Sequence, residues 1–148
     1  IIYDIYGQVY DEDYWSECLE LIGKLPAHIL VNYKGTVTPD KLNEIISMNH
    51  SLFMPTLGEN FGHAILETMS SGRPVIISDK TQWRELSSLK AGWDIPLDNY
   101  EMFVETLIKL AQMDQEEFNK WCHGARIASE KSVNIKELIS KYEDMFGY

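Results

Sequence analysis

Short apolar runs alternate along the chain with stretches whose apolar residues follow helical spacing. The runs, each followed by turn-forming residues, predict strands over Ile1–Tyr6, His28–Tyr33, Ser51–Met54, Pro74–Ser78 and Gly92–Ile95. The helical spacing predicts helices over Asp11–Leu25, from Pro39, over His63–Ser71, from Asp98 or Asn99, from Asp114 and over Ile135–Phe146, with a short one around Trp83–Leu86. This alternation predicts an α/β fold: a doubly wound, Rossmann-like parallel sheet of about five strands with extra C-terminal helices.

The most informative stretch runs from Ser51 to Asp79 and predicts a strand, a loop, a helix and a second strand. Pro55 ends the first strand, and Gly72 stands where a left-handed residue commonly follows a helix. The run Pro74–Ser78 has no polar alternation, which is typical of a parallel strand covered on both faces. Ligands of such sheets bind beyond the carboxyl ends of the strands, so the loop before the helix is the expected binding loop.

The loop opens onto a helix N-terminus, where backbone N–H groups of Phe61, Gly62 and His63 are expected to face outward. Gly58 and Gly62 allow a ligand to approach the backbone closely. Two carboxylates near such an anion site, Glu59 and Glu67, fit a ligand that has both phosphate and sugar hydroxyl groups. The alternative is that Glu59 only caps the helix and Glu67 is only solvated, since acids are favoured at helix starts.

The whole string P-T-x-G-E-N-F-G-H-A-I-L-E, followed by G-x-P-V-I-I-S-D, resembles the donor-binding signature of retaining glycosyltransferases with the GT-B fold. In that family two glutamates separated by seven residues mark the sugar-nucleotide pocket, and Glu59 and Glu67 match them. The later S-D-x-T-x-W-R and A-G-W-D-I-P-L strings resemble features of a subgroup. Gln82 departs from the proline expected before Trp83.

The resemblance implies transfer of a hexose from a nucleoside-diphosphate sugar to an acceptor with retention of anomeric configuration, without a metal or other cofactor. It implies Glu59 as the residue nearest the chemistry and Glu67 as the ligand of the ribose hydroxyls. The remaining expected contacts are Gly58, Asn60, Phe61, Gly62 and His63 for donor sugar and phosphate, and Gly35 and Val37 for the base. No catalytic nucleophile is assigned.

The chain is expected to be a single Rossmann-like donor-nucleotide-binding domain over residues 1–148, shortened at its N-terminus, because it starts without Met inside a predicted strand. In the family a further strand and helix come first, and their loop brings Arg and Lys to the diphosphate. Without that strand, Ile1–Tyr6 is expected to pair directly with Ser51–Met54 in the order 2-1-3-4-5; otherwise another chain must fill the gap. The acceptor, a glycan or lipid-linked glycan, would bind a missing N-terminal domain, so the isolated domain is expected to be inactive.

Charge and composition narrow the class further. The net charge of −10 argues against a nucleic-acid partner, which requires a basic face. No apolar run reaches the roughly 18 residues of a transmembrane segment. Cys18 and Cys122 lie far apart and suggest no disulfide framework or metal spacing, so we expect the cytoplasm, or the inner face of the membrane for the full-length protein.

Several alternatives stay open at this stage. His63 is either a donor contact or a partly exposed residue of the first helical turn, and Trp83 and Trp93 are expected to pack rather than to stack on sugars. A metal held by Glu59 and Glu67 lacks a third ligand at a recognisable spacing. A different class of function is a non-catalytic sugar-nucleotide-binding module. A sugar-nucleotide epimerase of related fold has no support from the surrounding motif.

Overall fold

The computed structural model describes residues 1–132, so the helix predicted over Ile135–Phe146 lies outside the described residues. The chain divides into two compact units, Ile1–Leu42 and the part from Asn43 onward. The elements are β1 (Ile2–Tyr6), α1 (Glu12–Ile22), β2 (Leu30–Gly35), α2 (Pro39–Met48), β3 (Leu52–Met54), α3 (His63–Ser70), β4 (Val75–Ser78), β5 (Gly92–Ile95), α4 (Tyr100–Gln112) and α5 (Gln115–Ser132).

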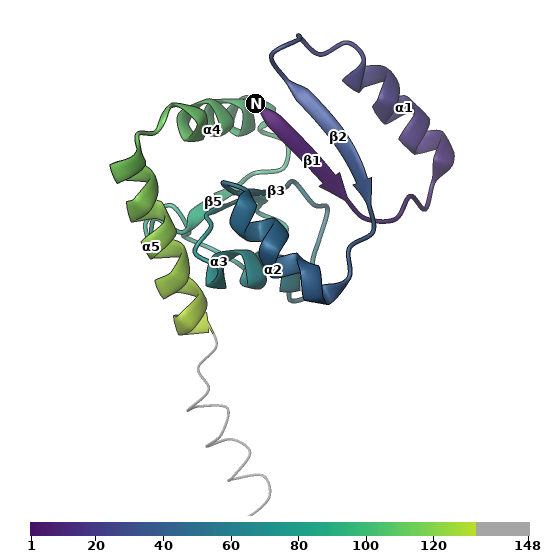
Figure 1. Cartoon of the computed structure of the whole chain (residues 1–148). Helices are drawn as coiled ribbons and strands as arrows, with labels where there is room; N and C mark the ends of the chain where they lie inside the picture. Colours follow the sequence, from purple (N-terminus) through teal and green to yellow (C-terminus); the bar gives the residue numbers. More distant parts are fainter. Residues whose placement is uncertain (133–148) are drawn as a thin grey trace, which may run out of the picture. The chain divides into compact units, whose positions relative to one another are not determined.

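In the first unit, β1 and β2 form a parallel pair that is connected through α1 (Figure 1). Asp11 is the N-cap of α1, and its carboxylate accepts a hydrogen bond from the Tyr14 N–H. The helix ends at Ile22 instead of the predicted Leu25, because the N–H groups of Lys24 and Leu25 bond to carbonyls three residues back, not four. Trp15 of α1 packs on Tyr33 of β2 with ring centroids 5.0 Å apart.

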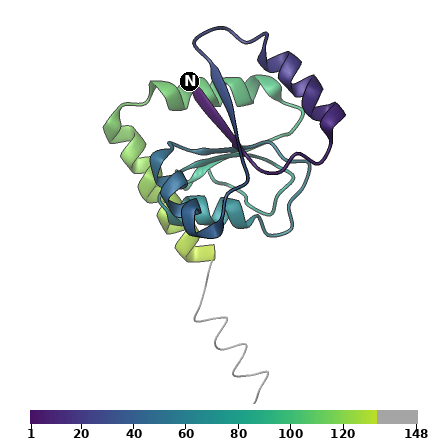
Figure 2. The ribbon, with the colours of Figure 1, turned by 45° about the vertical axis from the view of Figure 1, so that its right-hand side comes forward.

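In the second unit, β3, β4 and β5 form a parallel sheet in that order, with β4 in the middle. Every residue of β4 is buried, which confirms the two-sided covering predicted from its sequence. On one face, Val75 and Ile77 pack with Ile65 and Met69 of α3. On the other face, Ile76 packs with residues that include Phe103 of α4, so the two helices cover opposite faces (Figure 2).

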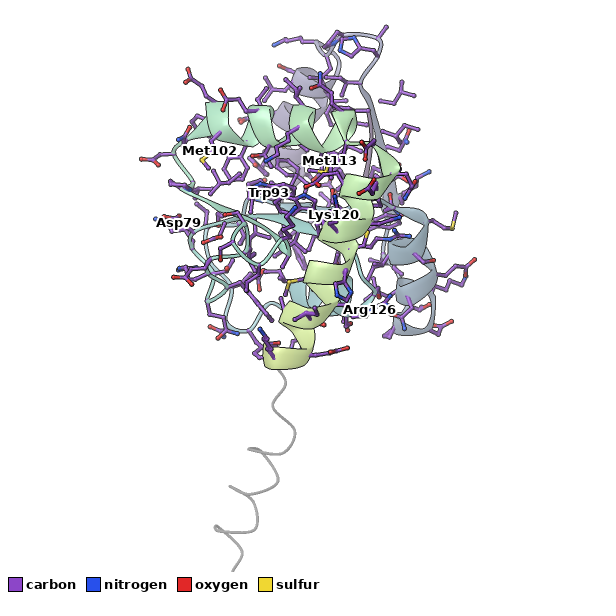
Figure 3. All side chains as sticks on the ribbon, turned by 90° about the vertical axis from the view of Figure 1, so that its left-hand side faces the viewer. Asp79, Trp93, Met102, Met113, Lys120 and Arg126 are labelled. Carbon is purple, nitrogen blue, oxygen red and sulfur yellow. The ribbon has the colours of Figure 1, made fainter. Side chains whose placement is uncertain are left out.

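Helix α5 contributes to both of these cores. Trp121 belongs to the core on the α4 side and stacks on Trp93 of β5, with ring centroids 3.9 Å apart. Trp93 is labelled in Figure 3. Further along the helix, Ala125 and Ala128 belong to the core on the α3 side. Asp114 caps α5: its carboxylate accepts a hydrogen bond from the Glu117 N–H, three residues later, which is the spacing of a helix cap.

The predicted pairings of β2 with β1, β3 with β4 and β4 with β5 are confirmed, but the prediction of one five-stranded sheet with β1 paired to β3 is wrong. The five strands form a two-stranded sheet, β1-β2, and a three-stranded sheet, β3-β4-β5, and no ladder joins β1 to β3. The resemblance implies a further strand that separates β1 from β3 in the strand order of the family, and residues 1–132 contain no such strand. The prediction assumed that β1 would pair with β3 when this strand is missing. The α/β class with parallel strands is nevertheless confirmed.

The short helix predicted around Trp83–Leu86 is also wrong, because Trp83–Glu85 have no regular secondary structure and a turn begins at Leu86. The Asp94 carboxylate of β5 accepts hydrogen bonds from the N–H groups of Glu85 and Leu86. These donors are therefore bonded outside the local backbone, and Glu85 adopts a left-handed conformation, with φ at 58°. A left-handed residue without glycine's freedom interrupts a right-handed helix.

Candidate functional site

The loop of residues 56–62 follows the carboxyl end of β3 and leads into α3. Because β3 and β4 are parallel, the residues after β4, starting with Asp79, emerge at the same edge of the sheet. The backbone of the two segments is close: a Cβ built on Gly58 would lie 4.0 Å from the Lys80 carbonyl oxygen. This edge is where open α/β sheets bind their ligands.

The loop ends at Gly62, the N-cap of α3, which adopts a left-handed conformation (φ 71°, ψ 58°). A side chain here would place its Cβ 2.8 Å from the Ile65 Cδ1 atom, so both the backbone conformation and the local packing favour glycine. No side chain caps the helix. Within residues 1–132, the N–H groups of Phe61, Gly62 and His63 meet no acceptor. The first turn of α3 therefore has backbone donors that are unbonded within the described residues, and their orientation toward a ligand stays a prediction.

Two polar side chains of the same loop are available for a ligand. Glu59 and Asn60 are exposed, and neither makes a hydrogen bond or ion pair to any other described residue. The alternative that Glu59 caps the helix is wrong, because the N-cap position belongs to Gly62 and receives no side-chain bond. The Glu59 carboxylate thus has no structural partner in the described part of the chain.

Glu67 lies one turn further along α3 and is half-buried. Its side chain also has no hydrogen-bond or ionic partner among residues 1–132. A partly desolvated carboxylate without a partner is costly, which makes Glu67 a good acceptor for an incoming hydroxyl group. His63 begins the helix, and its ring lies 5.0 Å from the Phe61 ring, centroid to centroid.

The structure thus brings together seven of the nine expected site residues, namely Gly58–His63 and Glu67, in one continuous segment of the second unit. The other two, Gly35 and Val37, lie in the first unit, at and just after the carboxyl end of β2. Gly35 has a φ of 71°, and its carbonyl accepts a hydrogen bond from the Gly7 N–H.

Three residues after or at the end of β4 hold the loop and were missed by the sequence reasoning. The Ser78 hydroxyl donates to the Thr56 carbonyl, and both the Gln82 amide and the Trp83 indole donate to the Phe61 carbonyl. Because every residue has a main-chain carbonyl, a hydrogen bond from a side chain to a carbonyl cannot be predicted from a complementary side chain in the sequence. Two signals were available: Ser78 is a polar residue that ends an otherwise apolar buried strand, and the S-D-x-T-x-W-R string contains both Ser78 and Trp83.

The two cations of the segment that follows β4, Lys80 and Arg84, are already paired. Lys80 forms an ion pair with Asp79, with its Nζ 3.1 Å from Oδ1. The Arg84 guanidinium donates to the carbonyls of Trp83 and Asp79. The hydrogen bond from Lys80 lowers the pKa of Asp79, and the Leu97 N–H lowers it further, so this carboxyl stays ionised beside the lysine.

The described residues contain no group of three or more His, Cys, Asp or Glu side chains arranged to hold a metal ion. Cys18 and Cys122 are both free thiols. None of the helices within residues 1–132 combines the length and the apolar content needed to cross a membrane.

Comparison with solved structures gives the same fold at low sequence identity. WaaG, a glycosyltransferase involved in lipopolysaccharide biosynthesis, matches 96% of this chain with a TM-score of 0.68 at 18% identity. HepE of Anabaena in complex with UDP and glucose matches 97% with a TM-score of 0.72 at 16% identity. TarM matches 100% with a TM-score of 0.72 at 20% identity. The chain spans 37%, 39% and 29% of these three proteins, respectively.

A search of curated protein sequences gave no significant match. The sequence pattern of the family described as Glycosyl transferases group 1 matches residues 3–113, which include the loop, α3 and all five strands except the first residue of β1. The matched range covers well over half of the chain and contains both glutamates of the predicted signature. The chain therefore belongs to the glycosyl transferases group 1 family.

Proposed function

We propose that this chain supplies the donor-binding half, the C-terminal domain, of a retaining hexosyltransferase that uses a nucleoside-diphosphate sugar. The observation that carries the proposal is the uncapped first turn of α3, flanked by two carboxylates without partners, Glu59 and Glu67. Helix N-termini bind phosphate, and carboxylates bind sugar hydroxyls. The HepE complexes with UDP and with UDP-glucose support the same class of donor for this fold.

In this proposal the N–H groups of Asn60–Gly62 hold sugar hydroxyls and phosphate, and Gly58 lets the donor approach. Glu67 accepts hydrogen bonds from the ribose, and Glu59 faces the transferred sugar. Positive charge develops on the sugar and negative charge on the leaving diphosphate in the transition state, so fixed donors at the helix end stabilise the leaving group. The roles of His63 in donor contact and of Gly35 and Val37 in base contact stay predictions, as does the independence from metal.

A thermal-shift screen of the whole protein against nucleoside diphosphates and their sugars tests the proposal. We expect one family of nucleoside-diphosphate sugars to raise the melting temperature in a concentration-dependent way, because ligands that bind only the folded state stabilise it. The identity of the strongest ligand would also name the base and the sugar. Absence of a shift with every nucleotide sugar at millimolar concentration would contradict the donor assignment.

Glu67→Ala in the whole protein is expected to weaken donor binding by about 1.5–3 kcal/mol, because each hydrogen bond to a charged group is worth that much. Folding should be little affected, since Glu67 has no partner in the described residues. Calorimetric titration with the donor measures the change. Glu105→Ala, an exposed glutamate of α4, is the matched control. Unchanged donor affinity in a folded Glu67→Ala protein would rule out the ribose contact.

A non-catalytic sugar-nucleotide-binding module is the second candidate, because the chain spans only 40% of the HepE structures with UDP and with UDP-glucose. A measurement of donor turnover distinguishes this module from a transferase. We expect the whole protein to release nucleoside diphosphate from its donor when an acceptor is present, and the chain of 148 residues alone to release none. A pure binding module would release none in either form.

A further inference from the structure

The loop between β3 and α3 is held at both ends and is unsupported between them. At its start, the Ser78 hydroxyl donates to the Thr56 carbonyl, and the Thr56 hydroxyl in turn bonds to Gly58. At its end, the Phe61 carbonyl accepts two hydrogen bonds from the segment after β4. Between these anchors, the Leu57 side chain is 88% exposed. The direction of the polar groups in the loop therefore depends on the anchors.

The second anchor, at the Phe61 carbonyl, fixes the orientation of the Phe61–Gly62 peptide group. The Trp83 Nε1 lies 3.0 Å from the Phe61 carbonyl oxygen, and the Gln82 Nε2 lies 3.1 Å from the same atom. A carbonyl oxygen has two lone pairs, so both of its acceptor positions are occupied. In a trans peptide group the C=O and the following N–H point in opposite directions within one plane. With its oxygen held by Trp83 and Gln82, this group must direct the Gly62 N–H away from both side chains.

The indole is a rigid support for this contact. Trp83 is only 8% exposed and packs in the same core as Ile65 and Leu86, and its backbone N–H donates to the Thr81 hydroxyl. A Cβ on Gly62 would come within 3.4 Å of the Trp83 Nε1, which shows how closely the helix start approaches the ring. Gln82 is exposed, so its contribution is expected to be the smaller one.

We propose that Trp83, with Gln82 as its auxiliary, is a positioning residue of the donor site: its indole N–H orients the Phe61–Gly62 peptide group so that the Gly62 N–H faces the ligand. The inference rests on the proposed function and adds to it a residue that does not touch the donor. Trp83 thus has a role beyond the packing role that its sequence position suggests. The departure to glutamine at position 82 gains a physical reason as well, because proline there would supply no side-chain donor.

Trp83→Phe in the whole protein removes the indole N–H and keeps most of the apolar ring. We expect the dissociation constant for the nucleoside-diphosphate sugar to rise about tenfold, which corresponds to the loss of one well-oriented hydrogen bond. The matched control is Trp93→Phe. Trp93 is 6% exposed and stacks on Trp121, but its indole N–H makes no hydrogen bond to the described residues. Both variants should melt at lower temperature, and only Trp83→Phe should bind the donor more weakly.

Gln82→Met keeps the test decisive if Trp83→Phe does not fold. It removes the second donor from an exposed position, so we expect an unchanged melting temperature and an approximately twofold to threefold weaker donor affinity. Donor affinity equal to the wild type in folded Trp83→Phe, or in Gln82→Met if only that variant folds, would overturn the positioning role. A wild-type protein that binds no nucleoside-diphosphate sugar would instead overturn the proposed function itself, and calorimetry on the wild type distinguishes these failures.

Discussion

A Glu59→Gln variant of the whole protein is expected to turn over about 100-fold more slowly than the wild type, while its donor affinity changes by less than about threefold. The carboxylate has no structural partner among residues 1–132 and lies in the loop before the left-handed Gly62. Glutamine preserves the size and one acceptor oxygen but removes the negative charge. That charge matters most when positive charge develops on the sugar, so the loss appears in the transition state and not in the ground state.

Steady-state kinetics together with a calorimetric titration of the donor measure this split. Glu101→Gln is the matched control, because Glu101 is an exposed glutamate in the first turn of α4. The melting temperature of both variants should stay near that of the wild type, since Glu59 caps no helix. Normal turnover in folded Glu59→Gln would remove the proposed contact between this carboxylate and the reacting sugar.

Gly92→Ala is expected to destabilise the protein by about 4 kcal/mol or more, a large share of the roughly 5–15 kcal/mol that folded domains possess. Gly92 begins β5 with a φ of 152° and pairs with Val75 of β4. A Cβ at this position would lie 2.1 Å from the Val75 carbonyl oxygen. Both groups belong to the backbone of paired, buried strands, so neither can move aside without opening the sheet.

Urea unfolding followed by circular dichroism measures this effect. Gly58→Ala is the matched control in the same unit, because its Cβ would meet only the Lys80 carbonyl, at 4.0 Å, which is ordinary contact. We expect the control to change the free energy of unfolding by less than about 1 kcal/mol. A Gly92→Ala protein as stable as this control would show that the close approach of β5 to β4 is not required for folding.

The central β3–loop–α3–β4 unit could be predicted from sequence because each of its boundaries has a local cause. Pro55 follows β3, Gly72 adopts the left-handed conformation after α3 with a φ of 71°, and the run Val75–Ser78 is apolar on both faces. The resemblance to the family signature added Glu59 and Glu67, which the structure places within one segment of loop and helix.

The errors concern features that no local signal determines. Strand pairing is non-local, and the order of β1 and β3 depended on a strand that the described residues do not contain. The turns around Glu85 depend on Asp94, nine residues later in a different strand. The contacts of Gln82 and Trp83 with the Phe61 carbonyl involve a main-chain acceptor, so the sequence offers no complementary residue to detect.

Hydrogen–deuterium exchange of the whole protein, with and without its nucleoside-diphosphate sugar, tests the central claim most directly. The claim predicts that the donor slows exchange in the peptide covering Gly58–Glu67, where the N–H groups of Phe61, Gly62 and His63 otherwise have no acceptor in the described residues. The groove lined by Glu105, Lys109 and Glu117 between α4 and α5 serves as the internal comparison and should not change. Protection that appears in that groove, or elsewhere in the protein, and is absent from Gly58–Glu67 would contradict the account.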